Sequence, residues 1–280
     1  MATMVAEPAS ILVKRDGKYP CVSATMRREE IPFVAFGCLH VGADTFCEEL
    51  LDKTIAWVKD NDALWIGTGD WMENATKYSP GDGVYRQKMS PDEQIEYITE
   101  KFRPISDRCI GCIRGNHEER TIKTTGIDPM AIICRELKMP YLGVEIFANI
   151  VMGAESSSRS FSIYAVHSTM ASKTEGLEMN TIERDIEKFA GFDIIVKGHG
   201  HKAALSGPYA YLAYDKHANM VKEGRRWFML TGSFLEDRPN TYAAQRPMRP
   251  RIPGTIAIIL RLRRIERVEK EVRLVDLRDL

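Results

Sequence analysis

The chain has 280 residues, a length that fits one large domain or two smaller ones. Hydrophobic residues make up 44% and charged residues 28%, so the composition is that of a folded globular protein and excludes a mainly disordered chain. Lys and Arg number 39, as do Asp and Glu. This balance gives no overall attraction to nucleic acid or anionic lipid, although it is compatible with a local basic groove.

The amino terminus and the apolar runs predict a cytoplasmic protein with no membrane partner. The first residues, MATMVAEPAS, contain neither the basic nor the apolar region that a secretory signal needs. The longest wholly apolar runs, such as 256–260, are far shorter than the ~20 residues of a membrane-spanning helix.

Apolar runs and turn residues predict the following elements in chain order. A turn signal at Asp16-Gly17 predicts a hairpin over 11–25. Strands that end in glycine are expected at 31–36, 63–66, 109–113 and 194–196, with helices at 47–59, 91–102, 129–137 and 179–189. Further strands are expected at 144–151, 161–166, 227–230, 255–262 and 268–275. Strands alternating with amphipathic helices predict an α/β architecture with two packed sheets, helices outside and one domain.

The remaining stretches predict loops, an edge strand and core cysteines. Loops are expected at 75–88, 203–226 and 236–254, and the last, rich in Arg and Pro, fits a substrate-selecting loop and a stiff connection equally well. Charged and apolar residues alternate over 261–278 and predict a half-solvated edge strand.

The six cysteines are too few for a disulfide scaffold. Cys109 and Cys112 have CxxC spacing, but without a second CxxC they are expected in the core.

Metal-binding residue types follow five of the predicted strands. Because strand ends lie along one edge of an open α/β sheet, these side chains are expected to meet there. Imidazoles, a thiolate or carboxylate and an amide oxygen suit zinc, iron or manganese, and Asp70, which could bridge two ions, predicts a two-metal site. The segments are Cys38-Leu39-His40, Asp70-Trp71-Met72-Glu73-Asn74, Asn116-His117-Glu118, His167 and His199-Gly200-His201.

Taken in order, these motifs resemble those of the calcineurin-like metallophosphoesterase superfamily. The resemblance is carried by GDWMEN at 69–74, GNHE at 115–118, His167 and GHGH at 198–201, and it covers residues 33–234. The segments GDWMENAT and RGNHEERT are most similar to those of small phosphoesterases of phages, bacteria and archaea. The resemblance implies an α/β four-layer αββα sandwich, with two central mixed β-sheets flanked by helices. It also implies one domain over 1–280, with a motif core at about 31–235 and strands in 253–277 completing the sheets.

The resemblance further implies a metallophosphoesterase that hydrolyses a phosphodiester or phosphomonoester, of nucleotide or nucleic-acid type. Two divalent ions (Mn, Zn or Fe) would activate a hydroxide and stabilise the developing charge. His117 would be the catalytic general acid or transition-state stabiliser. Arg114 and Arg120 could bind the substrate phosphate or pair with nearby carboxylates. The implied ligands are Cys38, His40, Asp70 and His201 for one ion, and Asp70, Asn116, His167 and His199 for the other.

One departure from the family pattern leaves alternatives open. Cys38 stands where the first motif normally has aspartate, although RNA lariat debranching enzymes of the superfamily also carry cysteine there. A thiolate favours zinc or iron over manganese or magnesium. If Cys38 were unligated, the first site would be impaired and the protein would be a catalytically weakened metal-binding module. A protein phosphatase is less favoured, because Met72-Glu73-Asn74 replaces the arginine-containing GDxVDR pattern.

Overall fold

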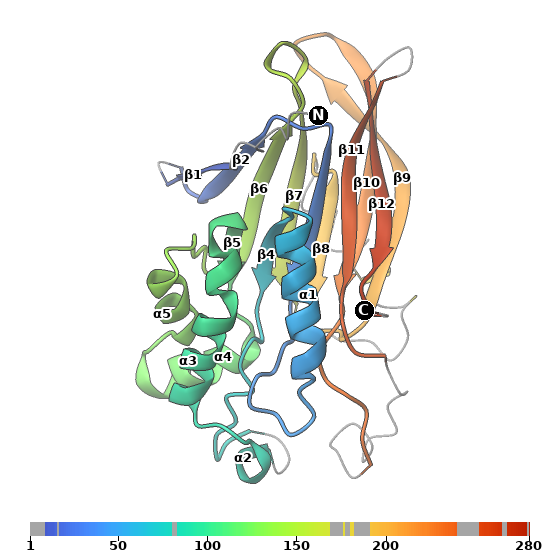
Figure 1. Cartoon of the computed structure of the whole chain (residues 1–280). Coiled ribbons are helices and arrows are strands. Elements are labelled where there is room, and N and C mark those ends of the chain that lie inside the picture. The colour runs from blue at the N-terminus through green and yellow to red at the C-terminus, as the bar shows by residue number, and fades with distance from the viewer. Residues whose placement is uncertain are drawn as a thin grey trace.

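Two mixed β-sheets form the centre of the computed structural model, which describes residues 9–15, 17–79, 83–168, 176, 180–181, 191–239, 252–264, 268–278 and 280 (Figure 1). The strands are β1 Ser10–Lys14, β2 Cys21–Met26, β3 Glu30–Phe36, β4 Leu64–Thr68, β5 Cys109–Ile113, β6 Glu145–Met152, β7 Arg159–His167, β8 Ile194–Gly198, β9 Ala203–Asp215, β10 Met220–Thr231, β11 Ile256–Arg264 and β12 Val268–Asp276. One sheet has the order β1-β2-β6-β7-β8-β10-β9 and the other β12-β11-β3-β4-β5. The predicted α/β architecture of two mixed sheets flanked by helices is confirmed.

An apolar core fills the space between the two sheets. On β6, half-buried and buried residues alternate along the whole strand, and the buried positions, such as Ile146 and Ile150, face inward. They pack with Phe33 of β3 and Val196 of β8. The period of two places one apolar face of each sheet against the other and leaves the strand ends free to carry polar groups.

Helices cover the outer face of the five-stranded sheet. They are α1 Glu48–Asp60, α2 Gly83–Arg86, α3 Pro91–Phe102, α4 Asn116–Thr125 and α5 Pro129–Glu136, with short 3₁₀ helices at Arg103–Arg108 and Glu155–Ser157. Residues of α1, α3 and α5 bury their apolar faces in one cluster with Phe36 and Trp65 of the sheet. Within this cluster Trp71 stacks on Phe102 with ring centroids 4.4 Å apart. None of the described helices is both long and apolar enough to cross a membrane.

Most of the predicted elements are confirmed within a few residues. The hairpin predicted over 11–25 is the antiparallel pair β1–β2. The helix predicted at 91–102 is α3, which begins where the Ser90 hydroxyl accepts a hydrogen bond from the Glu93 backbone. The stretch 261–278 does include an edge strand, β12. The helix expected at 179–189 lies outside the described residues apart from 180–181.

One local prediction is wrong, and one helix was not predicted. The stretch 203–226, expected as a loop, is a long hairpin in which β9 pairs with β10 from Ala203↔Thr231 to Asp215↔Met220. Gly207-Pro208 falls beside a register shift that interrupts the ladder without ending it. Helix α4 was not predicted either, because only Glu118 among its residues is buried and no apolar face marks it.

The CxxC pair lies in the core, as predicted. Cys109 and Cys112 of β5 are both buried, and their sulfur atoms lie 3.4 Å apart. Burial raises the pKa of both thiols. The two groups therefore stay neutral at physiological pH and act as small apolar side chains.

Candidate metal centre

Six residues with polar or metal-binding side chains, all in loops that follow strands, adopt the left-handed backbone conformation. Their φ angles run from 43° to 82°, a region that costs a non-glycine residue about 1–3 kcal/mol unless the surroundings impose it. Backbone hydrogen bonds between the loops hold them: the Cys38 amide donates to the Gly69 carbonyl (3.0 Å) and the His40 amide to the Asp70 carbonyl (3.1 Å). The six are Cys38, His40, Asp70, Asn74, His199 and His201.

The loops after β4 and β5 approach so closely that both need glycine. A methyl group on Gly69, whose φ is +86°, would lie 2.4 Å from the backbone nitrogen of Gly115. A methyl group on Gly115 would lie 2.2 Å from Oδ1 of Asp70. This contact lets Asp70 Oδ1 accept a hydrogen bond from the His117 amide at the start of α4 (2.8 Å). One carboxylate oxygen is therefore held at a helix N-terminus, where the dipole favours negative charge.

The fully buried carboxylate of Glu118 ties the same two loops together. It accepts hydrogen bonds from the backbone amides of Gly115 (2.7 Å), Asp70 (3.0 Å), Trp71 (2.8 Å) and Met72 (3.2 Å). Burial raises its pKa, and the neighbouring charge of Asp70 adds to the effect, while the amides act in the opposite direction. Sequence reasoning gave Glu118 no role; its third position in a helix beginning at GNHE was the available signal.

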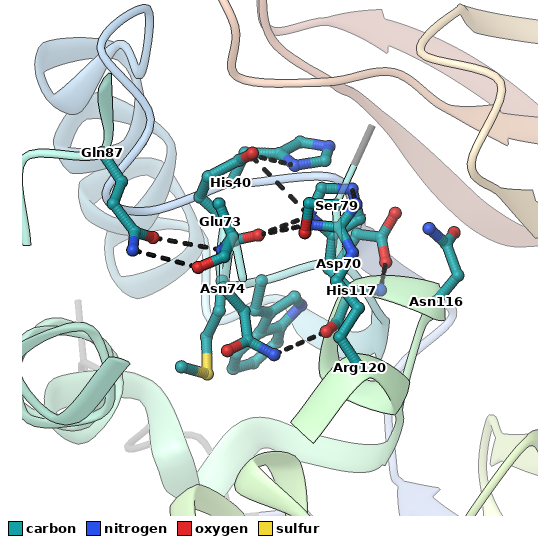
Figure 2. Close-up of polar contacts among 12 residues, drawn as sticks. His40, Asp70, Glu73, Asn74, Ser79, Gln87, Asn116, His117 and Arg120 are labelled. Atoms are coloured by element: carbon teal, nitrogen blue, oxygen red, sulfur yellow. Dashed lines mark hydrogen bonds and ion pairs between the residues drawn. The ribbon is translucent and has the colours of Figure 1, made fainter. Parts of the chain in front are cut away.

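The first group of potential ligand atoms comes from the loops after β3 and β8. The Sγ of Cys38 and the ring nitrogens of His40 and His201 lie within 4.8 Å of one another. Nδ1 of His40 lies 3.2 Å from a Glu73 carboxylate oxygen, which favours a proton on Nδ1 and a lone pair on Nε2 (Figure 2). His40 Nε2 faces His201 Nε2 at 3.1 Å, so a proton or a cation must lie between them. Two nitrogen ligands of a tetrahedral zinc ion would be about 3.3 Å apart.

The second group surrounds Oδ2 of Asp70. His167 Nε2 lies 3.1 Å from this oxygen and 3.0 Å from Oδ1 of Asn116, while Nδ1 of the same ring donates to the Thr68 carbonyl (2.7 Å). Nδ1 of His199 lies 3.8 Å from the carboxylate oxygen. Among the described residues, neither Asp70 Oδ2 nor His199 Nδ1 has a hydrogen-bond partner, although both atoms are buried. A cation would satisfy both.

The charge on Asp70 also fits a cation. Burial by itself would raise its pKa, but the nearby imidazoles of His117 and His167 hold the pKa well below its ordinary value. The carboxylate is therefore ionised in the interior, where its Oδ2 lies 3.1 Å from the imidazole of His167. Together with a thiol, four imidazoles and an amide oxygen, it forms a donor set suited to zinc, iron or manganese. The structure thus brings all seven residues expected as metal ligands to one edge of the sheets.

His117 lies beside this group but differs from its expected protonation state. Its Nδ1 donates to the Glu73 carbonyl (2.7 Å), and its Nε2 accepts from the Arg120 guanidinium (2.9 Å). Because a guanidinium can only donate, Nε2 carries no proton in this arrangement. Burial lowers the pKa of His117 to about 4. The ring is therefore neutral here. The protonated form expected of a general acid is not present while Arg120 donates a hydrogen bond to Nε2.

The two arginines expected near the phosphate differ in what they contact. Arg120 also donates to the Glu73 carbonyl (3.0 Å) and stays at the edge of the site (Figure 2). Arg114 donates instead to Tyr141 (3.1 Å) and Asp128 (3.4 Å), away from the potential ligands. Substrate binding by Arg114 is therefore not supported, because its guanidinium is part of the contact between β5 and α5.

Comparison with known proteins gives distant structural similarity. No family model matches the chain, and no curated protein matches it. A conserved uncharacterised protein of Streptococcus pneumoniae, described as a predicted phosphoesterase, is 11% identical with a TM-score of 0.34, covering 91% of this chain and 92% of its own. Vacuolar protein sorting 29 of Cryptosporidium parvum is 13% identical with a TM-score of 0.37, covering 88% of this chain and 98% of its own. Vps29 of Chaetomium thermophilum is also 13% identical, with a TM-score of 0.35, covering 88% of this chain and 94% of its own. Similarities this distant carry no conclusion about activity.

We expect Glu118→Gln to destabilise the protein and loosen the site. The amide group of glutamine would turn N–H donors toward backbone amides that now donate to a carboxylate, which should lower the free energy of unfolding by about 2–4 kcal/mol. Urea denaturation of the metal-free protein measures this loss. Glu119→Gln is the matched control, because this neighbouring side chain pairs with the exposed Lys123 and has only a long contact of 3.8 Å with Arg114, so it should change stability by less than about 0.5 kcal/mol. Equal stability of the two variants would contradict the role given to Glu118.

Proposed function

We propose that this protein is a metal-dependent phosphoesterase acting on a phosphodiester or phosphomonoester of nucleotide or nucleic-acid type. The observation that carries the proposal is the convergence of electron-pair donors around Asp70 Oδ2, a buried and ionised oxygen without a hydrogen-bond partner among the described residues. In a purely structural cluster this charge would rest on the neighbouring imidazoles, with His167 Nε2 at 3.1 Å from Oδ2. A divalent cation compensates it, and the neighbouring Arg120 provides the positive charge that a phosphate needs.

The seven converging residues divide into two ligand sets that share Asp70. Cys38, His40 and His201 would hold one ion with Asp70, and Asn116, His167 and His199 would hold the other. The thiolate of Cys38 directs the first set toward zinc or iron. When bound, such ions lower the pKa of a coordinated water and neutralise charge on a phosphate.

The chain itself prepares these ligands. Glu73 accepts a hydrogen bond from Nδ1 of His40, so the lone pair on Nε2 points toward His201. The Thr68 carbonyl fixes His167 in the same way, with Nε2 directed at Asp70. Both imidazoles are therefore held in the tautomer that a metal ligand requires.

Arg120 and His117 would then act on the substrate. In the proposal, the phosphate draws the Arg120 guanidinium away from Nε2 of His117, because a dianionic or monoanionic phosphate is a stronger acceptor than a neutral imidazole. Nε2 would then take up a proton from solvent, which the negative charge of the phosphate favours, and direct it at the leaving oxygen, while Nδ1 keeps its hydrogen bond to Glu73. General acid assistance by His117 thus depends on the movement of Arg120.

The direct test is turnover of a chromogenic bis-aryl phosphodiester with added Mn²⁺ or Zn²⁺. We expect hydrolysis that a chelator abolishes and that the returned metal restores, since a bound metal is needed to make water a nucleophile at neutral pH. Elemental analysis of the same preparation, purified without chelator, identifies the metals. Stoichiometric metal without turnover on mono- or diesters would favour the non-catalytic metal-binding module.

His117→Ala should keep the bound metal but lower the rate on an unactivated diester by ~10²–10⁴-fold, the usual worth of general acid–base assistance. A substrate with a good leaving group needs little protonation and should lose less. Paired rate measurements on the two substrates separate these outcomes, with His217→Ala, in the turn between β9 and β10, as control. Equal losses on both substrates would contradict the general acid and leave only phosphate positioning.

Cys38→Ala should weaken metal binding at the first set while the second set stays filled. Cys38→Asp restores a charged ligand and should recover binding with a preference shifted toward the harder Mn²⁺. Metal content by elemental analysis, together with zinc and manganese titrations, distinguishes the variants, and the exposed Cys21→Ala is the control. Two full sites and wild-type activity in Cys38→Ala would remove Cys38 from the ligands.

A further inference from the structure

Strand β9 forms a sheet edge without the features that protect the other three edges of the two sheets. Strand β1 has only five residues and leads into the basic pair Lys14 and Arg15. Five of the nine residues of β12 are charged. The free side of β5 is covered by backbone, because the Cys112 amide donates to the Pro140 carbonyl and the Cys112 carbonyl accepts from the Leu142 amide, both at 2.9 Å. Short length, charge and coverage are the usual ways in which proteins block edge pairing.

Strand β9 has none of these protections. It is 13 residues long, and its one charged residue is the last, Asp215, whose carboxylate is already bound by Lys222 at 2.5 Å. Within the described parts of the chain its backbone ladder is formed with β10 alone. Figure 1 shows β9 at the margin of the molecule opposite α3, α4 and α5. A long, neutral edge of this kind is a template for another strand.

Exposed apolar side chains gather on the same part of the hairpin. Leu212 is 76% exposed and Tyr214 60%, and Val221, paired with Tyr214 on β10, is 58% exposed. Leu212 and Tyr214 lie on one face of β9, because side chains two positions apart share a face. The open edge therefore carries an apolar row that would be buried if a further strand were added.

We propose that two copies of the chain associate by antiparallel pairing of β9 about a two-fold axis at Leu212. In this pairing, large and small side chains of the two copies lie opposite each other. Around that axis Leu212 meets Leu212 of the second copy, Ala210 meets Tyr214 and Tyr211 meets Ala213, so Tyr211 and Tyr214 each face an alanine, and Tyr209 meets Asp215 at the ends of the segment. Directly opposed residues in an antiparallel pair have their Cβ atoms ~4.5–5.5 Å apart, close enough for these side chains to pack.

Charge and strand geometry also favour a second copy. Pairing about Leu212 brings no two like charges opposite each other, whereas a charged partner strand would find no counter-charge on β9. Pro208 lacks an N–H group and ends the pairing segment on one side, and the turn after Asp215 ends it on the other. The paired segment is thus Tyr209–Asp215, and the result is one continuous sheet through both copies.

The experiment is sedimentation velocity of the full chain over ~1–200 µM, since an interface of one strand pair lies at the small end of specific contacts. We expect a reversible monomer–dimer equilibrium. Leu212→Lys should raise the dissociation constant at least about tenfold, because two lysines then face each other across the axis. Leu12→Lys, at an exposed position on the protected edge β1, is the matched control and should leave dimerisation unchanged.

A charge-pairing experiment tests the register itself. Leu212→Glu alone should be monomeric like Leu212→Lys, and an equimolar mixture of the two should regain the dimer, because only opposed positions 212 can restore it. A wild-type chain that stays monomeric over the whole range would overturn the proposal. Dimerisation that Leu212→Lys does not affect, or a failure of the mixture to associate, would equally overturn pairing about Leu212.

Discussion

The burial of two carboxylates side by side is the constraint on which the candidate site depends. Asp70 and Glu118 are both inaccessible to solvent, and a buried charge costs several kcal/mol unless it is compensated. The compensation is unequal. Glu118 is surrounded by backbone amides, whereas Asp70 receives one amide on Oδ1 and leaves Oδ2 among ring nitrogens and the Asn116 oxygen. Glu118 is therefore satisfied by backbone amides, whereas Asp70 Oδ2 depends on the ring nitrogens around it.

This inequality explains the local geometry of the loops. To deliver their amides to Glu118, the residues after β4 must turn sharply, which places Asp70 in the left-handed conformation and brings Gly69 against Gly115. The strain is supported by the rigid packing below, where Trp71 is buried in the cluster between the five-stranded sheet and its helices. The same packing that stabilises the fold thus orients the unpaired oxygen toward the other strand ends.

Much of this arrangement could be predicted from sequence, because it follows from strand ends and glycine. The ligand-type residues after Gly37, Gly69, Gly115 and Gly198 identified the edge at which side chains would meet, since parallel strands bring their ends together. Roles that depend on three-dimensional partners could not be predicted. The engagement of Arg114 with Tyr141 and the neutral state of His117 both arise from contacts between segments distant in sequence or from burial. The β9–β10 hairpin was missed because its exposed faces remove the usual apolar–polar alternation.

The backbone at Cys38 helps to separate a ligand from an ordinary buried cysteine. Cys109 and Cys112 lie within a regular strand and need nothing beyond burial to explain them. Cys38 is equally buried, but it adopts a φ of 52°, which costs free energy that a packing role would not require. Its sulfur also accepts a hydrogen bond from the His199 amide (3.2 Å), a contact that stabilises a thiolate and couples the loop after β3 to the loop after β8. A strained backbone that directs a sulfur toward His40 and His201 is the observation that favours the proposed ligation over an impaired site.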